Sequence, residues 1–449
     1  MSVALWLGFG GLMLRALGGD THWIRHVGRF MFDLCAVILM TTGLTHWLQS
    51  EQLGVSHVSG SFYWNVAVAA CAAVTGAVRG NTALSWTLLG LLPFGCMLCI
   101  ALGSLPGLFE RILKTLVHQL YIGVAFALYV LIYARPHDRL EWNGIFGDGL
   151  PKLAARSIYG LPFVAPYIGR LKFGHAVLVL SAYVAYFMLH VLGANRGGLI
   201  ISAVALPGLL AVLYWRAGRQ IGSPSTAARA AVVLVLTLGP LISLAAASRP
   251  ALADYLGARV QESIGRLAGG ETDDLQNFST AVVMQSEDEF LGTESRGGEL
   301  RDFLSQLGPL DYVTGRGFGG SWLSTYWGVE WQMVHIGFAH LILVGGVPLL
   351  LAFLAMVAQG LRNLWNALAA RECSAGAFCY IIVYLMGFTQ HGALQDENEL
   401  FLFWLCCGIG LANPQPRRSP PHYAPSAARA HLSRLWRPWR PWRPGVVQA

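Results

Sequence analysis

The sequence is poor in charge. Lys, Arg, Asp and Glu together make up 12% of its 449 residues, whereas hydrophobic residues make up 55% and the mean hydropathy is +0.50. Soluble domains carry about 25% charged residues, so this composition argues against an ordinary soluble enzyme. It indicates a polytopic membrane protein.

The sequence also lacks the patterns that mark a disulfide framework or a structural metal site. Its eight cysteines all lie in or beside apolar runs. Cys96 and Cys99 have CxxC spacing, but they fall within an apolar run and not after a strand, so core packing is the simpler interpretation. No spacing of His, Cys, Asp and Glu indicates zinc. We predict no metal and no cofactor.

Long apolar runs are what the sequence has in abundance. Runs of about 17–25 residues match the length of a membrane-crossing helix and are too long for barrel strands. We therefore predict an all-α polytopic membrane protein with about 11–12 transmembrane helices. The runs lie near residues 3–19, 30–48, 62–78, 83–103, 116–134, 174–192, 198–215, 230–248, 333–357, 376–392 and 399–413. A further re-entrant segment is predicted at residues 158–168, which Pro162 and Pro166 interrupt.

The distribution of Lys and Arg sets the predicted orientation. Arginines and lysines gather in alternate loops, namely those with Arg25 and Arg29, Arg79, residues 135–172, residues 216–229, and Arg362 and Arg371. These loops and the tail, which carries seven arginines, are predicted to be cytoplasmic. Residues 49–61, 104–115, 193–197, 249–331 and 393–398 then face outward. The first run is predicted to be a retained helix with Met1 outside, and a signal peptide is the alternative.

Four regions follow from this pattern. We predict N-terminal transmembrane helices over residues 1–248, a large periplasmic loop over 249–331, C-terminal transmembrane helices over 332–413 and a basic cytoplasmic tail over 414–449. The loop is predicted to contain helices at 252–267 and 299–307 and to form a folded cap. The Trp-Arg-Pro repeat of the tail suits a lipid headgroup interface. The net charge of +7 suits anionic lipid rather than nucleic acid.

Arginines on the outward side are the candidate anion-binding groups. Arg196 lies in a short connection beside Gly197 and Gly198, where its fork of donors can bind phosphate oxygens. A helix-capping arginine at the membrane edge is the structural alternative. Arg296 and Arg301 are five residues apart, so only one of them is expected to point at a site.

The segment after these arginines contains a glycine-rich turn and two histidines. Arg316 lies in GRGFGG, which follows no strand and opens no βαβ unit, so we reject a nucleotide-binding motif and predict turns with positive φ. His335 lies at the start of an apolar run, and His340 follows it. An imidazole can accept a proton from a sugar hydroxyl near neutral pH, although a histidine at a membrane edge is often structural.

An acidic group lies in the last outward loop. Asp396 and Glu397 are candidates for orienting His335 or binding acceptor hydroxyls, and a solvated helix start is the alternative.

The order of these features resembles the superfamily of O-antigen ligases and Wzy-type O-antigen polymerases. The resemblance rests on Arg196-Gly197 after a short outward turn, Arg296 in a long outer loop, the motif at 315–319, and His335 followed by Gly345-Gly346. The chain departs from the family at Ile336, after the histidine, and at Leu349.

The resemblance implies a metal-independent inner-membrane glycosyltransferase that acts at the periplasmic face. Its donor would be an undecaprenyl-diphosphate-linked oligosaccharide and its acceptor a glycan, with membrane lipids and a chain-length regulator protein as further partners. Arg196 and Arg296 would bind the donor diphosphate, and His335 would be the general base. Arg301, Arg316, His340, Asp396 and Glu397 would be secondary site residues.

Two choices remain open at this point. The departures fall in the version of the motif associated with ligases, which favours a polymerase, while O-antigen ligase is the alternative. A transporter or flippase of a lipid-linked glycan is the alternative from another class, and it predicts charged or broken helices near the bilayer midplane. A structural membrane subunit would leave the outward Arg and His residues unexplained.

Overall fold

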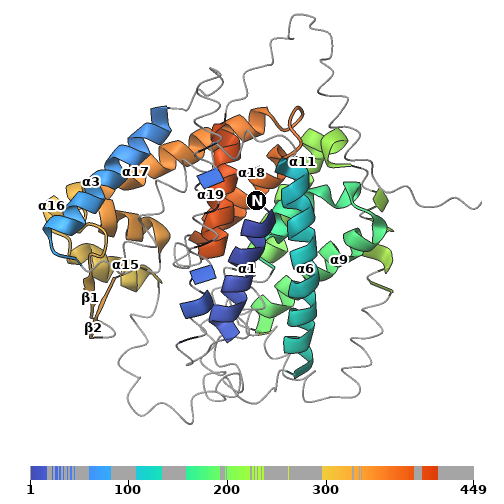
Figure 1. Ribbon diagram of the computed structural model, residues 1–449, viewed down its shortest axis with the longest axis horizontal. Coiled ribbons are helices and arrows are strands. Elements are labelled where there is room, and N and C mark those ends of the chain that lie inside the picture. Colours follow the sequence, from blue (N-terminus) through green and yellow to red (C-terminus); the bar gives the residue numbers. More distant parts are fainter. Residues whose placement is uncertain are drawn as a thin grey trace, which may run out of the picture. The chain divides into compact units, whose positions relative to one another are not determined.

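The computed structural model describes about half of the chain. The described residues are 2–17, 60–81, 108–133, 158–192, 198, 200–222, 296–325, 328–332, 334, 336–388 and 397–412, together with scattered positions at 23–45, at 225–236 and at 261. The chain divides into two units, residues 1–413 and 414–449. The second unit lies outside the described residues, and so do the predicted run at 83–103 and most of the predicted run at 230–248. Everything below concerns the first unit (Figure 1).

The described residues are almost entirely helical. The helices in chain order are α1 (Ser2–Leu17), α3 (Gly60–Val78), α6 (Leu108–Tyr133), α8 (Leu161–Val164), the 3-10 helix η3 (Ala165–Arg170), α9 (Phe173–Leu192), the π-helical turn η4 (Ile201–Ala205), α11 (Leu206–Ile221), α15 (Arg296–Ser305), α16 (Pro309–Thr314), α17 (Gly337–Asn366), α18 (Ser374–Phe388) and α19 (Glu397–Leu411). The strands β1 (Trp322–Ser324) and β2 (Val329–Trp331) form an antiparallel hairpin.

Three helices are long and apolar enough to cross a membrane. They are Gly60–Val78, Phe173–His190 and Gly337–Asn366. Shorter apolar helices lie at Ile201–Ala217, Ser374–Phe388 and Leu402–Leu411. The described helices confirm the predicted runs at 3–19, 62–78, 116–134, 174–192, 376–392 and 399–413 to within a few residues, apart from the start of α6, which comes earlier.

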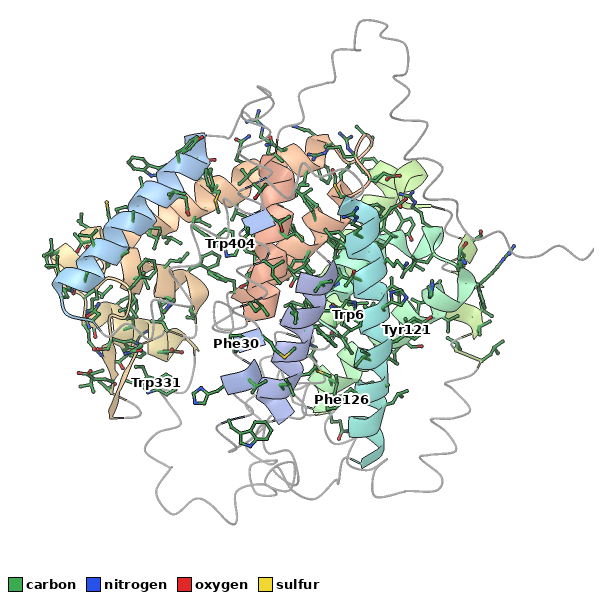
Figure 2. The ribbon with its side chains drawn as sticks, viewed as in Figure 1. Trp6, Phe30, Tyr121, Phe126, Trp331 and Trp404 are labelled. Atoms are coloured by element: carbon green, nitrogen blue, oxygen red, sulfur yellow. The ribbon has the colours of Figure 1, made fainter. Side chains whose placement is uncertain are left out.

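The last three helices pack on one another through stacked aromatic rings. Phe353 of α17 stacks on Phe388 of α18, with ring centroids 5.5 Å apart, and on Phe403 of α19 at 6.0 Å. Phe403 also stacks on Tyr384 at 4.4 Å. Trp404 meets Phe353 edge-on and is buried (Figure 2). Such rings bury large apolar areas, so these helices form the centre of the described core.

The proline-interrupted segment at 158–168 is a short, buried break, as its two prolines predicted. It folds as α8 followed by η3, with Pro162 and Pro166 each in the first turn of one of them. Tyr167 locks this break against α18: its hydroxyl donates to the carbonyl of Glu372 at 2.6 Å and accepts from the amide of Gly376 at 2.8 Å. A Cβ on Gly376 would meet the carbonyl of Phe163 at 2.6 Å, so only glycine permits this approach.

Candidate functional site

Residues 296–344 form a small folded unit, here called the cap. Its core is a cluster of buried residues from α15, the hairpin, the first two turns of α17 and the segments that join them, namely Phe303, Leu307, Trp322, Val334, Ala339 and Leu343. Phe303 and Trp322 meet edge-on with centroids 5.8 Å apart. The described part of the predicted outer loop is therefore a folded cap, and its second predicted helix is α15.

The glycine-rich turn of the cap lies directly against α3. Gly315, Gly317 and Gly319 have φ values of 66°, 79° and 80°, which confirms the predicted positive-φ turns. A Cβ on Gly317 would overlap the backbone of Gly76 in α3, and a Cβ on Gly76 would overlap the backbone of Phe318. The contact between these segments is therefore backbone against backbone.

Hydrogen bonds fix the turn to α3. The amide of Phe318 donates to the carbonyl of Ala72 at 3.2 Å. Asn81, just after α3, donates from its side-chain amide to the carbonyls of Arg316 at 2.9 Å and Phe318 at 2.8 Å. Three polar groups of the turn are thus satisfied by α3 and by Asn81 just after it, more than 230 residues earlier in the chain.

The same turn satisfies carbonyl groups that a kink in α17 releases. Gly346 has φ 67° and ψ −171°, and Pro348 lies inside the helix. Proline has no N–H, so the carbonyl of Val344 loses its helical donor. The amide of Gly317 donates to Val344 at 2.9 Å, and the amide of Arg316 donates to Leu343 at 2.6 Å. The kink and the turn therefore complete each other's hydrogen bonding.

The kink divides α17 into two parts with different surroundings. The part before the kink contributes Ala339 and Leu343 to the cap core. The part after it, residues 347–366, has twenty residues and is about 30 Å long, the thickness of a bilayer's hydrocarbon core.

Two arginines share one carboxylate where α3 meets the cap. Arg79 Nη1 lies 3.0 Å from Asp311 Oδ1, and Arg316 Nε lies 3.4 Å from Asp311 Oδ2. Burial alone would raise the pKa of Asp311, but the Gly308 amide and the two guanidinium groups outweigh it, so this pKa lies below its usual value. Asp311 thereby joins the end of α3 to the cap through both of its carboxylate oxygens.

This junction corrects one part of the predicted orientation. The alternation of basic loops predicts that Arg79 lies on the face opposite residues 249–331, but Arg79 and Asp311 form an ion pair. Residues 104–115 and Arg170 are likewise predicted to lie on opposite faces, but Phe109 lies 4.7 Å from Tyr167 and under the guanidinium of Arg170 at 5.6 Å. A single arginine is a weak orientation signal, and here its charge is used by a carboxylate of the cap.

Contacts between helix termini define the two ends of the described helix bundle. Arg170 pairs with Glu372 at 2.9 Å, Gly222 packs against Gly169, and Arg371 donates to the carbonyls of Ile409 and Ala412. We call this the Arg371 end. The opposite end, where α17 begins, is the cap end, and Phe388 at the end of α18 packs there on Gly337.

The directions of α9, α11 and α19 show at which end of the bundle each helix begins and ends. α9 starts just after Arg170, so its last residue, Leu192, lies about 30 Å from the Arg371 end, and α11 returns to that end at Gly222. α19 finishes at Arg371, so it starts at the cap end. The predicted outward segments 193–197 and 393–398 are flanked by these helix ends.

The described residues cover only part of the predicted site. Arg196, His335 and Asp396 lie outside them, and the side chains of Arg296 at the start of α15 and Glu397 at the start of α19 are likewise not described. Their binding and catalytic roles stay predictions.

Three secondary residues are described in full. Arg301 is exposed on α15. Arg316 donates to Asp311 and to the carbonyls of Ser321 at 2.7 Å and Gln306 at 2.6 Å, so its guanidinium holds the cap together. His340 is buried, and its Nδ1 accepts the amide of Val334 at 3.4 Å, which leaves the proton of the neutral ring on Nε2. His340 thereby orders the backbone one residue before His335.

The surroundings of Gly198 show how the turn after Arg196 is anchored. A Cβ on Gly198 would overlap the ring of His190 on α9. Ser202, in the π-helical turn η4, donates to the carbonyl of Gly198 at 2.6 Å, and Tyr183 donates to the carbonyl of Ser202. Single π-turns are often found at functional sites.

Sequence reasoning missed Arg79, Asn81 and Asp311, because the contacts that join them link segments far apart in the chain. Among the residues that the structure describes, no group of three or more His, Cys, Asp and Glu side chains is placed to hold a metal ion. No protein-family model matches the chain, and no curated protein matches it.

Proposed function

We propose that the chain is an inner-membrane glycosyltransferase that polymerises undecaprenyl-diphosphate-linked oligosaccharide repeat units at the periplasmic face. The cap end would face the periplasm, and the tail at 414–449 would be cytoplasmic. The observation that carries the proposal is the common location of the cap, the start of α17, the end of α18 and the start of α19. These elements flank four of the predicted site residues, Arg296, His335, Asp396 and Glu397.

The proposed reaction needs only protein side chains and the two substrates. The acceptor hydroxyl oxygen attacks the anomeric carbon of the donor, and the bond from that carbon to the phosphate oxygen breaks. Undecaprenyl diphosphate leaves with the electron pair, and His335 takes the hydroxyl proton. Arg196 and Arg296 stabilise the charge that grows on the leaving group. Direct displacement inverts the anomeric centre.

The ion pairs of Arg79 and Arg316 with Asp311 hold the cap against the end of α3. The buried His340 accepts a hydrogen bond from the amide of Val334, and this bond fixes the backbone next to His335.

The test is glycan synthesis by purified protein in vesicles that contain lipid-linked repeat units. Wild-type protein is expected to lengthen the glycan, and Arg196→Ala, Arg296→Ala and His335→Ala are each expected to lower the rate at least about 100-fold. The matched controls are Arg362→Ala and His118→Ala, which change exposed residues outside the cap and should retain full activity. Full activity in all three site variants would refute the assignment.

A deletion strain separates the polymerase from the ligase. Loss of a polymerase leaves single repeat units on the lipid A–core acceptor, whereas loss of a ligase leaves bare acceptor and accumulated lipid-linked polymer. Translocation of the donor without new glycosidic bonds would instead identify a transporter.

A further inference from the structure

The shortest helix of the cap carries an exposed apolar surface. In α16 no residue is buried, and Leu310 and Val313 are 64% and 62% exposed. These two residues are three positions apart and so lie on one face of the helix. Water is a poor environment for such a surface, and its position in the fold indicates what covers it.

That position is the end of a candidate membrane span. Asp311, between the two apolar residues in sequence, pairs with Arg79, the first residue after α3. α3 and α16 also pack on each other, and both lie beside α17 (Figure 1). Immediately before Arg79, α3 exposes Val74 at 63% and Val78 at 82%. Exposed apolar residues therefore occur on both helices that meet at this junction.

The length of α3 gives the depth of this junction. Its 19 residues span about 28 Å, close to the thickness of the hydrocarbon core. At its other end it exposes Tyr63 and Trp64, residue types that favour the boundary between lipid and water. If those rings mark one boundary, Arg79 and α16 lie at the other.

We propose that α16 lies in the lipid headgroup layer at the cap end, with Leu310 and Val313 inserted among the acyl chains. The partner is the lipid surface itself, and Arg79, whose side chain is 34% exposed, lies beside α16 where it can meet a lipid phosphate. The inference rests on the membrane location in the proposed function, but not on the glycosyltransferase activity.

Photocrosslinking of the full chain tests this placement. A benzophenone amino acid replaces Leu310, Val313, Val74 or Ser305, one at a time, in protein reconstituted in phosphatidylglycerol and phosphatidylethanolamine vesicles. Lipid adducts are detected by mass spectrometry after illumination. All four positions except Val74 belong to the cap, and Ser305 is an exposed polar position on α15. Adducts are expected at Leu310, Val313 and Val74, at least about 5-fold above Ser305.

The comparison of Val74 with Leu310 and Val313 distinguishes failure of the inference about α16 from failure of the membrane location. Adducts at Val74 but not at Leu310 and Val313 would overturn the interfacial position of α16 while leaving α3 in the membrane. Crosslinks from Leu310 or Val313 to a second copy of the chain would overturn it too, in favour of a protein interface. Absence of adducts at Val74 would overturn both the inference and the membrane location on which it rests. Equal unfolding midpoints for the four variants and wild type confirm that each is folded.

Discussion

The amide of Gly317 donates a 2.9 Å hydrogen bond to the carbonyl of Val344, the group that Pro348 leaves without a helical donor. A turn in the cap thereby completes the backbone hydrogen bonding of a helix that continues as a candidate membrane span. The pair explains why a proline and two glycines are tolerated inside α17. In an apolar environment, an unsatisfied carbonyl would cost several kcal/mol, on the order of 2–7.

Replacing Gly346 by Ala is expected to destabilise the protein by about 2–4 kcal/mol. Its φ of 67° is unfavourable for any residue with a Cβ, and that Cβ would meet the Tyr312 carbonyl at 2.6 Å. Chemical unfolding in detergent measures the effect. Gly208→Ala in α11 is the control, because nothing lies within 4 Å of the added methyl, and it should be neutral or slightly stabilising. Equal stabilities for the two variants would contradict this account of the kink.

Gly76→Ala should loosen the cap without disrupting α3 itself. Alanine favours a helix by about 0.5–1 kcal/mol over glycine, but here its methyl would overlap the backbone of Phe318. We expect faster hydrogen exchange at the amides of Gly317 and Phe318 than in wild type. Gly60→Ala, at the open start of the same helix, should leave this exchange unchanged. Unchanged protection in Gly76→Ala would show that the close approach is not required.

The stability that Asp311 provides should depend on pH. Its folded pKa lies below the unfolded value of about 3.9, so the contribution is complete above that value and is lost as pH falls through the folded pKa. Asp311→Asn should be less stable than wild type by about 1–3 kcal/mol at pH 7, and the gap should shrink below about pH 4. Arg79→Met should move the wild-type loss to higher pH. A gap that stays constant between pH 7 and pH 3 would be inconsistent with the ion pairs.

The corrected arrangement predicts which positions share a membrane face. With a membrane-impermeant maleimide added to intact spheroplasts, Arg79→Cys and Ser305→Cys should react, and Glu110→Cys should react only after permeabilisation. Wild-type protein gives the background from its native cysteines. The alternation of basic loops along the sequence predicts the reverse result for Arg79 and Glu110, so the experiment distinguishes the two arrangements.

Helices were the predictable part of the fold, because apolar periodicity and length are local properties. The run at 62–78 became α3 (Gly60–Val78), and the stretch at 299–307 became α15 (Arg296–Ser305). The bounds predicted for the run at 333–357 were less accurate, because α17 covers Gly337–Asn366. Its last turns contain Arg362 and Asn363 and are no longer apolar, although the helix continues.

The meeting of distant segments was not predictable. Arg79 and Asp311 are 232 residues apart, and neither has a neighbour in sequence that indicates the other. In the sequence, Gly76 is one of several small residues in an apolar run. Its requirement for glycine arises only from the close approach of the Phe318 backbone. In the candidate site, charge and motif were enough to predict which segments face outward, and that prediction stays open. The role of Arg316 in holding the cap together depends on carbonyl groups that no sequence pattern reveals.

The composition of the cap core has a consequence for the order of folding during synthesis. Phe303, Leu307 and Trp322 leave the ribosome before Ala339 and Leu343, which complete their cluster and belong to α17. The core of the cap therefore stays incomplete until the first two turns of α17 have been synthesised. The surface of α3 on which the cap docks is synthesised much earlier. The glycine-rich turn that packs on it follows more than 200 residues later in the chain. Completion of the cap core is thus coupled to the synthesis of α17, the helix that continues as a candidate membrane span.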